Sequence, residues 1–244
     1  MQKALQLIYT TWCIFWFLLV FLLLFPFMFI FVQRKSWLPK AHYLIRLWGQ
    51  LFLFFSAIRV KVKKEFTPDP HGVYVIVANH FSYMDIACMG VVLDNFYAFF
   101  GKSSVKKIPL LGYIFLKLHI QVDRGDKWSR SKSLLRGIKA LEDGRSICIF
   151  PEGGIISKNI PQMNLPLKDG AFIMAIEKQV PILPISFLNN YKLMPNILMK
   201  SGILQTIIHQ PIETKGMTKE GLEFLKKQVF EVIQPSLNNF ESKI

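Results

Sequence analysis

The chain has 244 residues, of which 52% are hydrophobic and 19% are charged, and its formal net charge is +14. This composition excludes an intrinsically disordered protein, which has few apolar residues, and the length suits one domain with an appendage. The three cysteines (Cys13, Cys88 and Cys148) are too scattered for a disulfide framework or a zinc site. We therefore expect reduced thiols in a protein that faces the cytosol.

The positive charge is concentrated near the N-terminus. Residues 1–64 contain nine lysine or arginine residues and no aspartate or glutamate. These charges flank long apolar stretches, whereas a nucleic-acid-binding protein needs a basic groove on a folded domain. The pattern predicts a basic collar beside an anionic lipid bilayer, and no nucleic-acid partner.

The first apolar segment covers residues 7–32 and contains no charged residue. A hydrocarbon core about 30 Å thick needs about 20 helical residues, so this segment can span a membrane with tilt. It is longer than the apolar core of a signal peptide and offers no small-residue cleavage site, which predicts a retained anchor kinked at Pro26. Basic residues after Val32 outnumber Lys3 before it. The positive-inside rule therefore places the rest of the chain on the cytoplasmic side of a bacterial inner membrane or its equivalent.

A second apolar segment covers residues 43–58, where Arg46 and Gln50 share one helical face. Three arrangements are open: an amphipathic helix in the membrane interface, a partner for the first helix, or a core helix of the following domain. We place the boundary after residue 64, with the membrane anchor and interfacial helix in residues 1–64 and the globular domain in residues 65–244.

The rest of the chain alternates short apolar runs with helical periodicities. Strands are predicted at residues 73–78, 96–100, 120–122, 146–150, 180–186 and 204–209, and helices at residues 129–141, 170–178 and 218–239. Pro181 and Pro184 favour an irregular or edge strand at residues 180–186. This alternation predicts an α/β fold with a mostly parallel sheet flanked by helices, joined to an N-terminal hydrophobic helical anchor.

The first candidate site follows the first predicted strand and reads Asn79-His80-Phe81-Ser82-Tyr83-Met84-Asp85. His80 and Asp85 can meet if the chain turns into a helix between them. The carboxylate would then fix the imidazole tautomer and leave the other ring nitrogen as a general base, which suits deprotonation of a substrate hydroxyl. Alternatively, His80 is a loop histidine and Asp85 is the N-cap of the next helix.

The second candidate site follows another predicted strand and reads Phe150-Pro151-Glu152-Gly153-Gly154. An acidic residue beside two glycines suits either a tight loop that approaches a ligand or a plain turn. The other histidines are predicted to be solvated (His71) or structural, with no nearby acidic partner (His42, His119 and His209).

Together these segments resemble the glycerolipid acyltransferase family, typified by 1-acylglycerol-3-phosphate acyltransferases. Residues 79–85 match the family's NH-x4-D block, and residues 150–154 match the start of its FPEGTRS block. Residues 101–109 with 122–124 resemble the block between them, and residues 180–185 resemble the late VPIVPV block. The blocks follow the family's order, and a hydrophobic N-terminal anchor is also usual there.

The resemblance implies a membrane-bound O-acyltransferase of phospholipid biosynthesis, which transfers a fatty acyl group from acyl-CoA or acyl-carrier protein to 1-acyl-sn-glycerol-3-phosphate and gives phosphatidic acid. His80 would take the proton of the acceptor hydroxyl and Asp85 would orient His80. No acyl-enzyme would form, and neither a cofactor nor a metal would be required. The acceptor would contact Asn79, Ser82, Lys102, Arg124, Glu152 and Gly153. The partners implied are a lipid bilayer, a lysophospholipid acceptor and the acyl donor.

One departure from the family pattern affects the acceptor. Gly154-Ile155 stands where the family has Thr-Arg, and that arginine belongs to the phosphate-binding set. Either Lys102, Arg124, Lys158 or Lys168 compensates, or the acceptor lacks the phosphate. A lyso-aminolipid, such as a lyso-ornithine or glycine lipid, is therefore an alternative acceptor.

Two further alternatives belong to other functional classes. One is a lipid or thioester hydrolase that uses His80 to activate water, and the other is a non-catalytic lipid-binding protein on the same fold. The absence of a G-x-S-x-G motif argues against an α/β-hydrolase. The intact His80–Asp85 pair argues against a non-catalytic protein.

Overall fold

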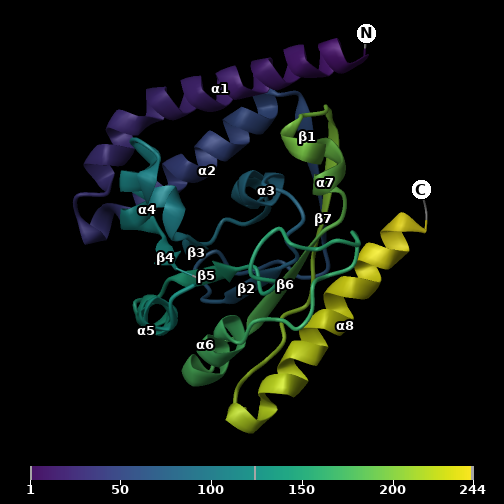
Figure 1. Ribbon diagram of the computed structural model, residues 1–244. Coiled ribbons are helices and arrows are strands. Elements are labelled where there is room, and N and C mark those ends of the chain that lie inside the picture. The colour runs from purple at the N-terminus through teal and green to yellow at the C-terminus, as the bar shows by residue number, and fades with distance from the viewer. Residues whose placement is uncertain (1, 124, 243–244) are drawn as a thin grey trace.

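The computed structural model describes residues 2–123 and 125–242. Within them the chain forms one seven-stranded sheet with helices on both faces (Figure 1). The strands are β1 Ile58–Lys64, β2 Val75–Ala78, β3 Tyr97–Lys102, β4 Ile120–Val122, β5 Ser146–Ile149, β6 Ile182–Phe187 and β7 Gly202–Ile208. The helices are α1 Gln2–Phe31, α2 Leu38–Phe55, α3 Met84–Val92, α4 Leu111–Leu118, α5 Lys127–Glu142, α6 Gly170–Lys178, α7 Asn190–Leu193 and α8 Leu222–Glu241, and a short 3₁₀ helix, η2, covers Ser103–Lys107.

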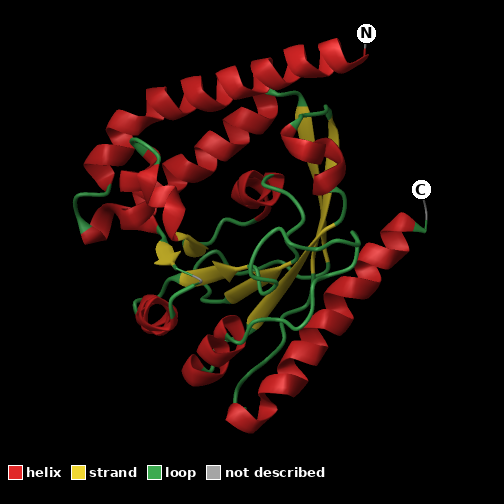
Figure 2. Ribbon diagram, viewed as in Figure 1, coloured by secondary structure: helices red, strands yellow, loops and turns green. Residues whose placement is uncertain are grey.

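The two faces of the sheet have separate hydrophobic cores. Ile76, Leu183 and Ile185 face one core, to which α2 and α3 contribute and against which α1 lies. Val75 and Ile147 face the other core, which α5, α6 and α8 complete. Strands buried on both faces read as continuous apolar runs, which explains why residues 75–78 are apolar throughout. Figure 2 shows the resulting layers of helix, sheet and helix.

The sheet order is β1-β7-β6-β2-β5-β3-β4, and every pair is parallel except β6–β7. The predicted α/β class with a mostly parallel sheet is confirmed. The predicted edge position of residues 180–186 is wrong, because β6 lies between β2 and β7. Pro184 is tolerated there because its backbone faces β7 and not β2. Its carbonyl accepts from His209 N, just beyond Ile185–Ile208, the last residue pair between β6 and β7. A backbone N–H at this position would point to the same side as the carbonyl. The absence of that N–H in proline therefore removes no hydrogen bond between β6 and β2.

The N-terminal segment forms a helical pair, α1 and α2, which packs on the α3 side of the sheet (Figure 1). Trp16 of α1 stacks on Phe55 of α2 with ring centroids 3.9 Å apart. On α2, Arg46 Nε and Gln50 Nε2 both donate to the carbonyl of Gly90 in α3, at 3.3 and 3.0 Å. The polar face of α2 therefore contacts α3, which favours the paired arrangement and the core arrangement over a free interfacial helix.

The domain boundary after residue 64 stays a prediction, but residues 58–64 belong to the sheet. Residues 58–64 form β1, which pairs along its whole length with β7. The basic side chains of this strand therefore belong to the edge of the sheet and not to a separate membrane segment. Residues 43–55 of the second apolar segment are helical, and the helix begins earlier, at Leu38.

Candidate active site

The candidate site lies at the carboxyl ends of β2 and β5, which are adjacent and parallel. Loops that follow parallel neighbouring strands leave the sheet at the same edge, where ligands bind in open α/β sheets. Residues 79–83 therefore meet residues 150–154. The sequence placed both segments after strands, and the topology brings them together.

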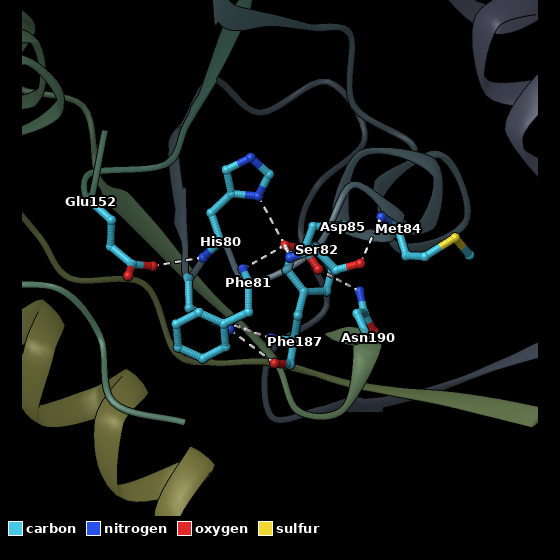
Figure 3. Close-up of polar contacts among 9 residues, drawn as sticks. His80, Phe81, Ser82, Met84, Asp85, Glu152, Phe187 and Asn190 are labelled. Atoms are coloured by element: carbon cyan, nitrogen blue, oxygen red, sulfur yellow. Dashed lines mark hydrogen bonds and ion pairs between the residues drawn. The ribbon is translucent and has the colours of Figure 1, made fainter. Parts of the chain in front are cut away.

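His80 and Asp85 form a buried pair at this edge (Figure 3). His80 Nδ1 lies 2.9 Å from Asp85 Oδ2, and Asp85 belongs to the first turn of α3. Figure 3 shows the other ring nitrogen of His80 pointing away from the carboxylate. The predicted meeting of the two side chains is confirmed in geometry, and their catalytic roles stay predictions.

The Asp85 carboxylate is held from several directions. Oδ2 also accepts from the backbone N–H groups of Phe81 and Ser82, both at 3.0 Å. Oδ1 accepts from Asn190 Nδ2 at 2.9 Å, and Asp85 has no exposed surface. These bonds hold the carboxylate in one orientation, so the imidazole that it contacts is held in one orientation as well.

Glu152 acts on the site through the backbone. Its Oε1 accepts from His80 N at 2.7 Å, and its Oε2 accepts from Asn164 N at 2.8 Å. Burial raises the pKa of this carboxyl from 4.5 to about 7, although both N–H donors act in the opposite direction. Because both oxygens hold backbone groups, Glu152 fixes His80 and the loop at residue 164. Its predicted contact with an acceptor stays a prediction.

Phe150 forms one wall of the site. Its ring stacks on the imidazole of His80 with centroids 4.0 Å apart and an interplanar angle of 12°. Only 7% of His80 is exposed. The ring of Phe150 therefore covers one face of the imidazole and limits its contact with water.

Two predicted acceptor contacts have structural partners of their own. Asn79 Nδ2 donates to Phe187 O at 2.9 Å and its Oδ1 accepts from Phe187 N at 2.8 Å, which ties the end of β2 to the end of β6. Ser82 Oγ accepts from Met84 N at 3.2 Å and helps to start α3. Both side chains are buried beside His80. The structure therefore gives each a role in shaping the loop that carries His80.

Of the two predicted phosphate contacts, the structure describes only Lys102. Lys102 is exposed at the end of β3, and Arg124 lies outside the described residues. Gly153 has a φ of +85°, a conformation that favours glycine. A Cβ at Gly153 would lie 3.5 Å from Lys168 Cγ, so the exposed side chain of Lys168 runs along the loop that carries Glu152.

Sequence reasoning missed Asn190 and the wall formed by Phe150. Asn190 is only 1% exposed and begins α7 directly after β6, which pairs with β2. The available signal was a polar Asn189-Asn190 pair after an apolar strand. Only the position of β6 beside β2 connects that pair to Asp85.

His209 also differs from its prediction, because it has an acidic partner. Its Nδ1 lies 2.9 Å from Glu65 Oε2 and its Nε2 lies 2.8 Å from Ser186 Oγ. A Ser–His–Glu series of this kind is the arrangement of a hydrolase nucleophile. Ser186, however, has no exposed surface, so a substrate cannot reach its hydroxyl. The series is therefore a polar tie between β6 and the ends of β1 and β7, buried at Ser186 and His209.

The geometry at His80 supports one kind of chemistry. A histidine oriented by a carboxylate can remove a proton from a bound hydroxyl or from water. Ser82, the serine next to the pair, uses its hydroxyl oxygen to accept from Met84 N and lies on the Asp85 side of the loop. The arrangement thus suits direct attack by a substrate oxygen better than attack by a protein nucleophile.

Comparison with known proteins places this site in a family. Relatives include a chloroplast 1-acyl-sn-glycerol-3-phosphate acyltransferase of Brassica napus, 28% identical over 70% of this chain and 50% of its own. Another is a 1-acyl-sn-glycerol-3-phosphate acyltransferase of Haemophilus influenzae, 24% identical over 82% of both chains. The crystal structure of a 1-acyl-sn-glycerophosphate acyltransferase from Thermotoga maritima has the same fold, with a TM-score of 0.78, 24% identity, and coverage of 99% of this chain and 98% of that one.

The matches cover different lengths of the chain. The chain spans about half the length of the chloroplast relative. The family model described as Acyltransferase matches residues 58–188, which begin at β1 and include both candidate segments. The chain therefore belongs to the acyltransferase family.

Proposed function

We propose that this chain is a membrane-bound O-acyltransferase that converts 1-acyl-sn-glycerol-3-phosphate into phosphatidic acid, with acyl-CoA or acyl-carrier protein as the acyl donor. The observation that carries the proposal is the buried His80–Asp85 pair, with Nδ1 held by the carboxylate and the other ring nitrogen directed away from it (Figure 3). Relatives named 1-acyl-sn-glycerol-3-phosphate acyltransferases support the choice of acceptor.

The reaction follows from the orientation of His80. Nδ1 donates to Asp85, so Nε2 carries the lone pair that takes the proton of the acceptor hydroxyl. The hydroxyl oxygen attacks the thioester carbonyl, the carbon–sulfur bond breaks, and the imidazolium returns its proton to the departing thiolate. Asp85 stabilises the imidazolium while it exists. Oxygen gains the acyl group, sulfur gains the proton, and no residue is acylated.

The acceptor phosphate needs a positive partner, and Lys168 is well placed to supply it. Its side chain lies along Gly153, beside the position where Gly154-Ile155 replaces the family's Thr-Arg. Lys168 N also donates to Pro151 O at 2.8 Å, which holds this lysine next to the Glu152 loop. A lysine can bind phosphate as a point charge where an arginine is absent.

The membrane location rests on α1. Among the described residues, α1 is the one helix that is long and apolar enough to cross a membrane by length and composition. Leu22, Leu23 and Phe27 are each more than half exposed on it. Exposed apolar patches of this extent mark a contact with lipid or protein, and a lipid contact would bring the acceptor to the site.

The test compares wild type, His80→Ala and His71→Ala in purified membranes. His71 is an exposed histidine in the turn before β2 and serves as the matched control. Each protein receives labelled palmitoyl-CoA or palmitoyl-acyl-carrier protein, with 1-acylglycerol-3-phosphate, 1-acylglycerol or lyso-ornithine lipid as separate acceptors. We expect phosphatidic acid from wild type and His71→Ala, and a loss of at least about 100-fold in His80→Ala.

Other outcomes identify the alternatives. Acylation of lyso-ornithine lipid alone would keep the mechanism and replace the acceptor. Release of free fatty acid without an acceptor would indicate a hydrolase. Equal transfer by wild type and His80→Ala would overturn the catalytic role of the pair.

A second variant tests the phosphate contact. Lys168→Ala should raise the KM for 1-acylglycerol-3-phosphate about tenfold, because a charge-assisted contact contributes about 1.5 kcal/mol or more. The KM for 1-acylglycerol, which has no phosphate, should stay unchanged. Lys158→Ala, which changes a second exposed lysine of the same loop, is the comparison. Equal effects of Lys168→Ala on both acceptors would remove Lys168 from the phosphate site.

A further inference from the structure

The outer face of α5 combines basic and apolar side chains that the catalytic site does not use. Trp128 is 85% exposed and Leu135 is 66% exposed, two helical turns apart. Lys132 and Arg136 are exposed between and beside them, and these four residues line a shallow groove of about 500 Å³. An exposed apolar pair within a basic surface indicates an interaction site.

The buried side of the same helix explains why these residues are not needed for the fold. Ser133, Gly137 and Leu141 face inward. Ser133 Oγ donates to Gln121 O at 2.7 Å and attaches α5 to β4. The helix is therefore anchored by its inner face, so the outer side chains are free to contact another molecule.

The charge on α5 is strongly one-sided. It carries Lys127, Arg130, Lys132, Arg136 and Lys139, and its one acidic residue is Glu142 at the last position. Lys139 pairs with Glu142 and Asp143. Within the described part of the chain, no carboxylate forms an ion pair with Lys132 or Arg136. This surface therefore suits an acidic partner.

The location of α5 argues against a membrane as that partner. α5 covers the face of the sheet opposite α2 and α3, and α1 lies beyond those two helices (Figure 1). A flat bilayer in contact with the exposed side of α1 cannot also contact the outer face of α5. The partner must therefore approach from the aqueous side.

The extent of the surface favours a macromolecule over a nucleotide. The exposed basic positions from Lys127 to Arg136 extend over about 14 Å of helix. A nucleotide would cover only part of that length. α5 also begins just after the carboxyl end of β4, at the same sheet edge as His80 and three strand spacings, about 15 Å, from β2. A thioester on a flexible arm can cross that distance.

We propose that the outer face of α5 docks an acidic acyl-carrier protein, with Trp128 and Leu135 as the apolar contacts and Lys132 and Arg136 as the charged ones. The inference rests on the proposed function, because it assigns the site of the acyl donor for that reaction. The carrier would deliver its thioester to His80 from the aqueous side, while the acceptor enters from the lipid.

The test uses the full chain in detergent, with the charge-reversed variant Lys132→Glu/Arg136→Glu. The control Lys219→Glu/Lys227→Glu changes the same charge at exposed positions of the C-terminal region. Binding of a purified bacterial palmitoyl-acyl-carrier protein is measured by surface plasmon resonance, and kcat/KM is measured with that donor and with palmitoyl-CoA. We expect carrier affinity and carrier kcat/KM to fall by about tenfold or more in the variant only. The palmitoyl-CoA value should change by less than about twofold.

Three results would overturn the proposal: no binding of the carrier by wild type, equal binding by wild type and variant, or an equal loss with both donors. The last would indicate a nucleotide site or a structural defect. Trp128→Ala gives a second check, since it removes an apolar contact without changing charge and should weaken carrier binding alone. If the carrier binds through α5 but no acceptor is acylated, the docking surface stands and the proposed function fails.

Discussion

The carboxylate of Asp85 is constrained by both backbone and side-chain donors. His80, Phe81 and Ser82 donate to one of its oxygens, and Asn190 donates to the other. The first three belong to the same loop and come with the turn into α3. Asn190 comes from a different part of the chain, so it is the contact that a single substitution can remove without changing the loop.

Asn190→Ala is therefore expected to act through Asp85. With one donor lost, the carboxylate can rotate, and we expect kcat to fall about tenfold with little change in KM. The control is Asn189→Ala, which removes bonds to Ile203 O and Gln205 N without touching Asp85. A matching loss of kcat in both variants would make Asn190 merely structural.

Glu152 is expected to make stability depend on pH. The folded carboxyl keeps its proton up to about pH 7, whereas its ordinary pKa is 4.5. Between these values the native state binds more protons than the unfolded state, so the free energy of unfolding falls as pH rises, by up to about 3 kcal/mol. Above pH 7 this contribution is constant.

Glu152→Gln removes the titration, so the variant should lack this loss of stability. Urea unfolding in detergent at pH 4.5 and pH 7.5 measures the effect as the difference between wild type and variant. Between pH 4.5 and pH 7.5, the free energy of unfolding of wild type should fall relative to that of the variant by up to about 3 kcal/mol. Parallel curves at both pH values would show that burial does not raise the pKa of Glu152.

At the scale of elements, several helices approach their neighbours through glycine. A Cβ at Gly49 of α2 would lie 3.1 Å from Ala87 O in α3. A Cβ at Gly112 of α4 would lie 2.3 Å from Lys106 O in η2, a backbone atom that cannot rotate away. The position of α4 over the sheet edge therefore depends on the absence of a side chain at Gly112.

Gly112→Ala should consequently destabilise the protein by about 1–3 kcal/mol, because α4 must shift to relieve the overlap. Gly221→Ala is the matched control, since no described atom lies within 4 Å of a Cβ built there. Its effect should stay below about 0.5 kcal/mol. Thermal unfolding of the two variants in the same detergent measures the contrast, and equal melting temperatures would contradict it.

Local sequence patterns predicted helices and strands well where the hydrophobic pattern lies within the element itself. The apolar run at residues 75–78 predicted β2, and helical periodicity predicted α5. The start of α5 was predicted two residues late. The helix is capped by Asp126, whose side chain accepts from Trp128 N and Ser129 N, and this cap precedes the apolar stripe. Four-residue spacing placed Arg46 and Gln50 on one face, but only the structure shows that this face contacts α3.

Contacts between distant residues could not be predicted in this way. The position of β6 beside β7 depends on a pairing that no local pattern encodes, and the proline rule therefore gave the wrong location. Asn190 lies 105 residues from Asp85 in the chain, and Glu65 lies 144 residues from His209. The His80–Asp85 pair was predictable because the two residues lie only five positions apart, across the turn into α3.

At the scale of the whole molecule, the exposed face of α1 leads to a test of membrane attachment. Leu22 and Leu23 are 53% and 64% exposed on this helix. Leu22→Asp/Leu23→Asp should move the protein out of the membrane fraction, since each aspartate near the centre of a membrane helix costs about 3 kcal/mol. The comparison is Leu22→Ala/Leu23→Ala, measured by flotation with vesicles. Unchanged flotation of the aspartate variant would show that this face does not contact lipid.

The pairing of β1 with β7 has a consequence for synthesis. Ile58 pairs with Gly202, so the first strand to leave the ribosome must wait for the last one. At ordinary translation rates that interval is on the order of ten seconds. During it, the proposed membrane helix α1 is already synthesised, while β1 has an unpaired edge. Under the proposed membrane attachment, α1 would insert before the sheet closes, and a chain truncated before residue 202 would have an open, aggregation-prone strand.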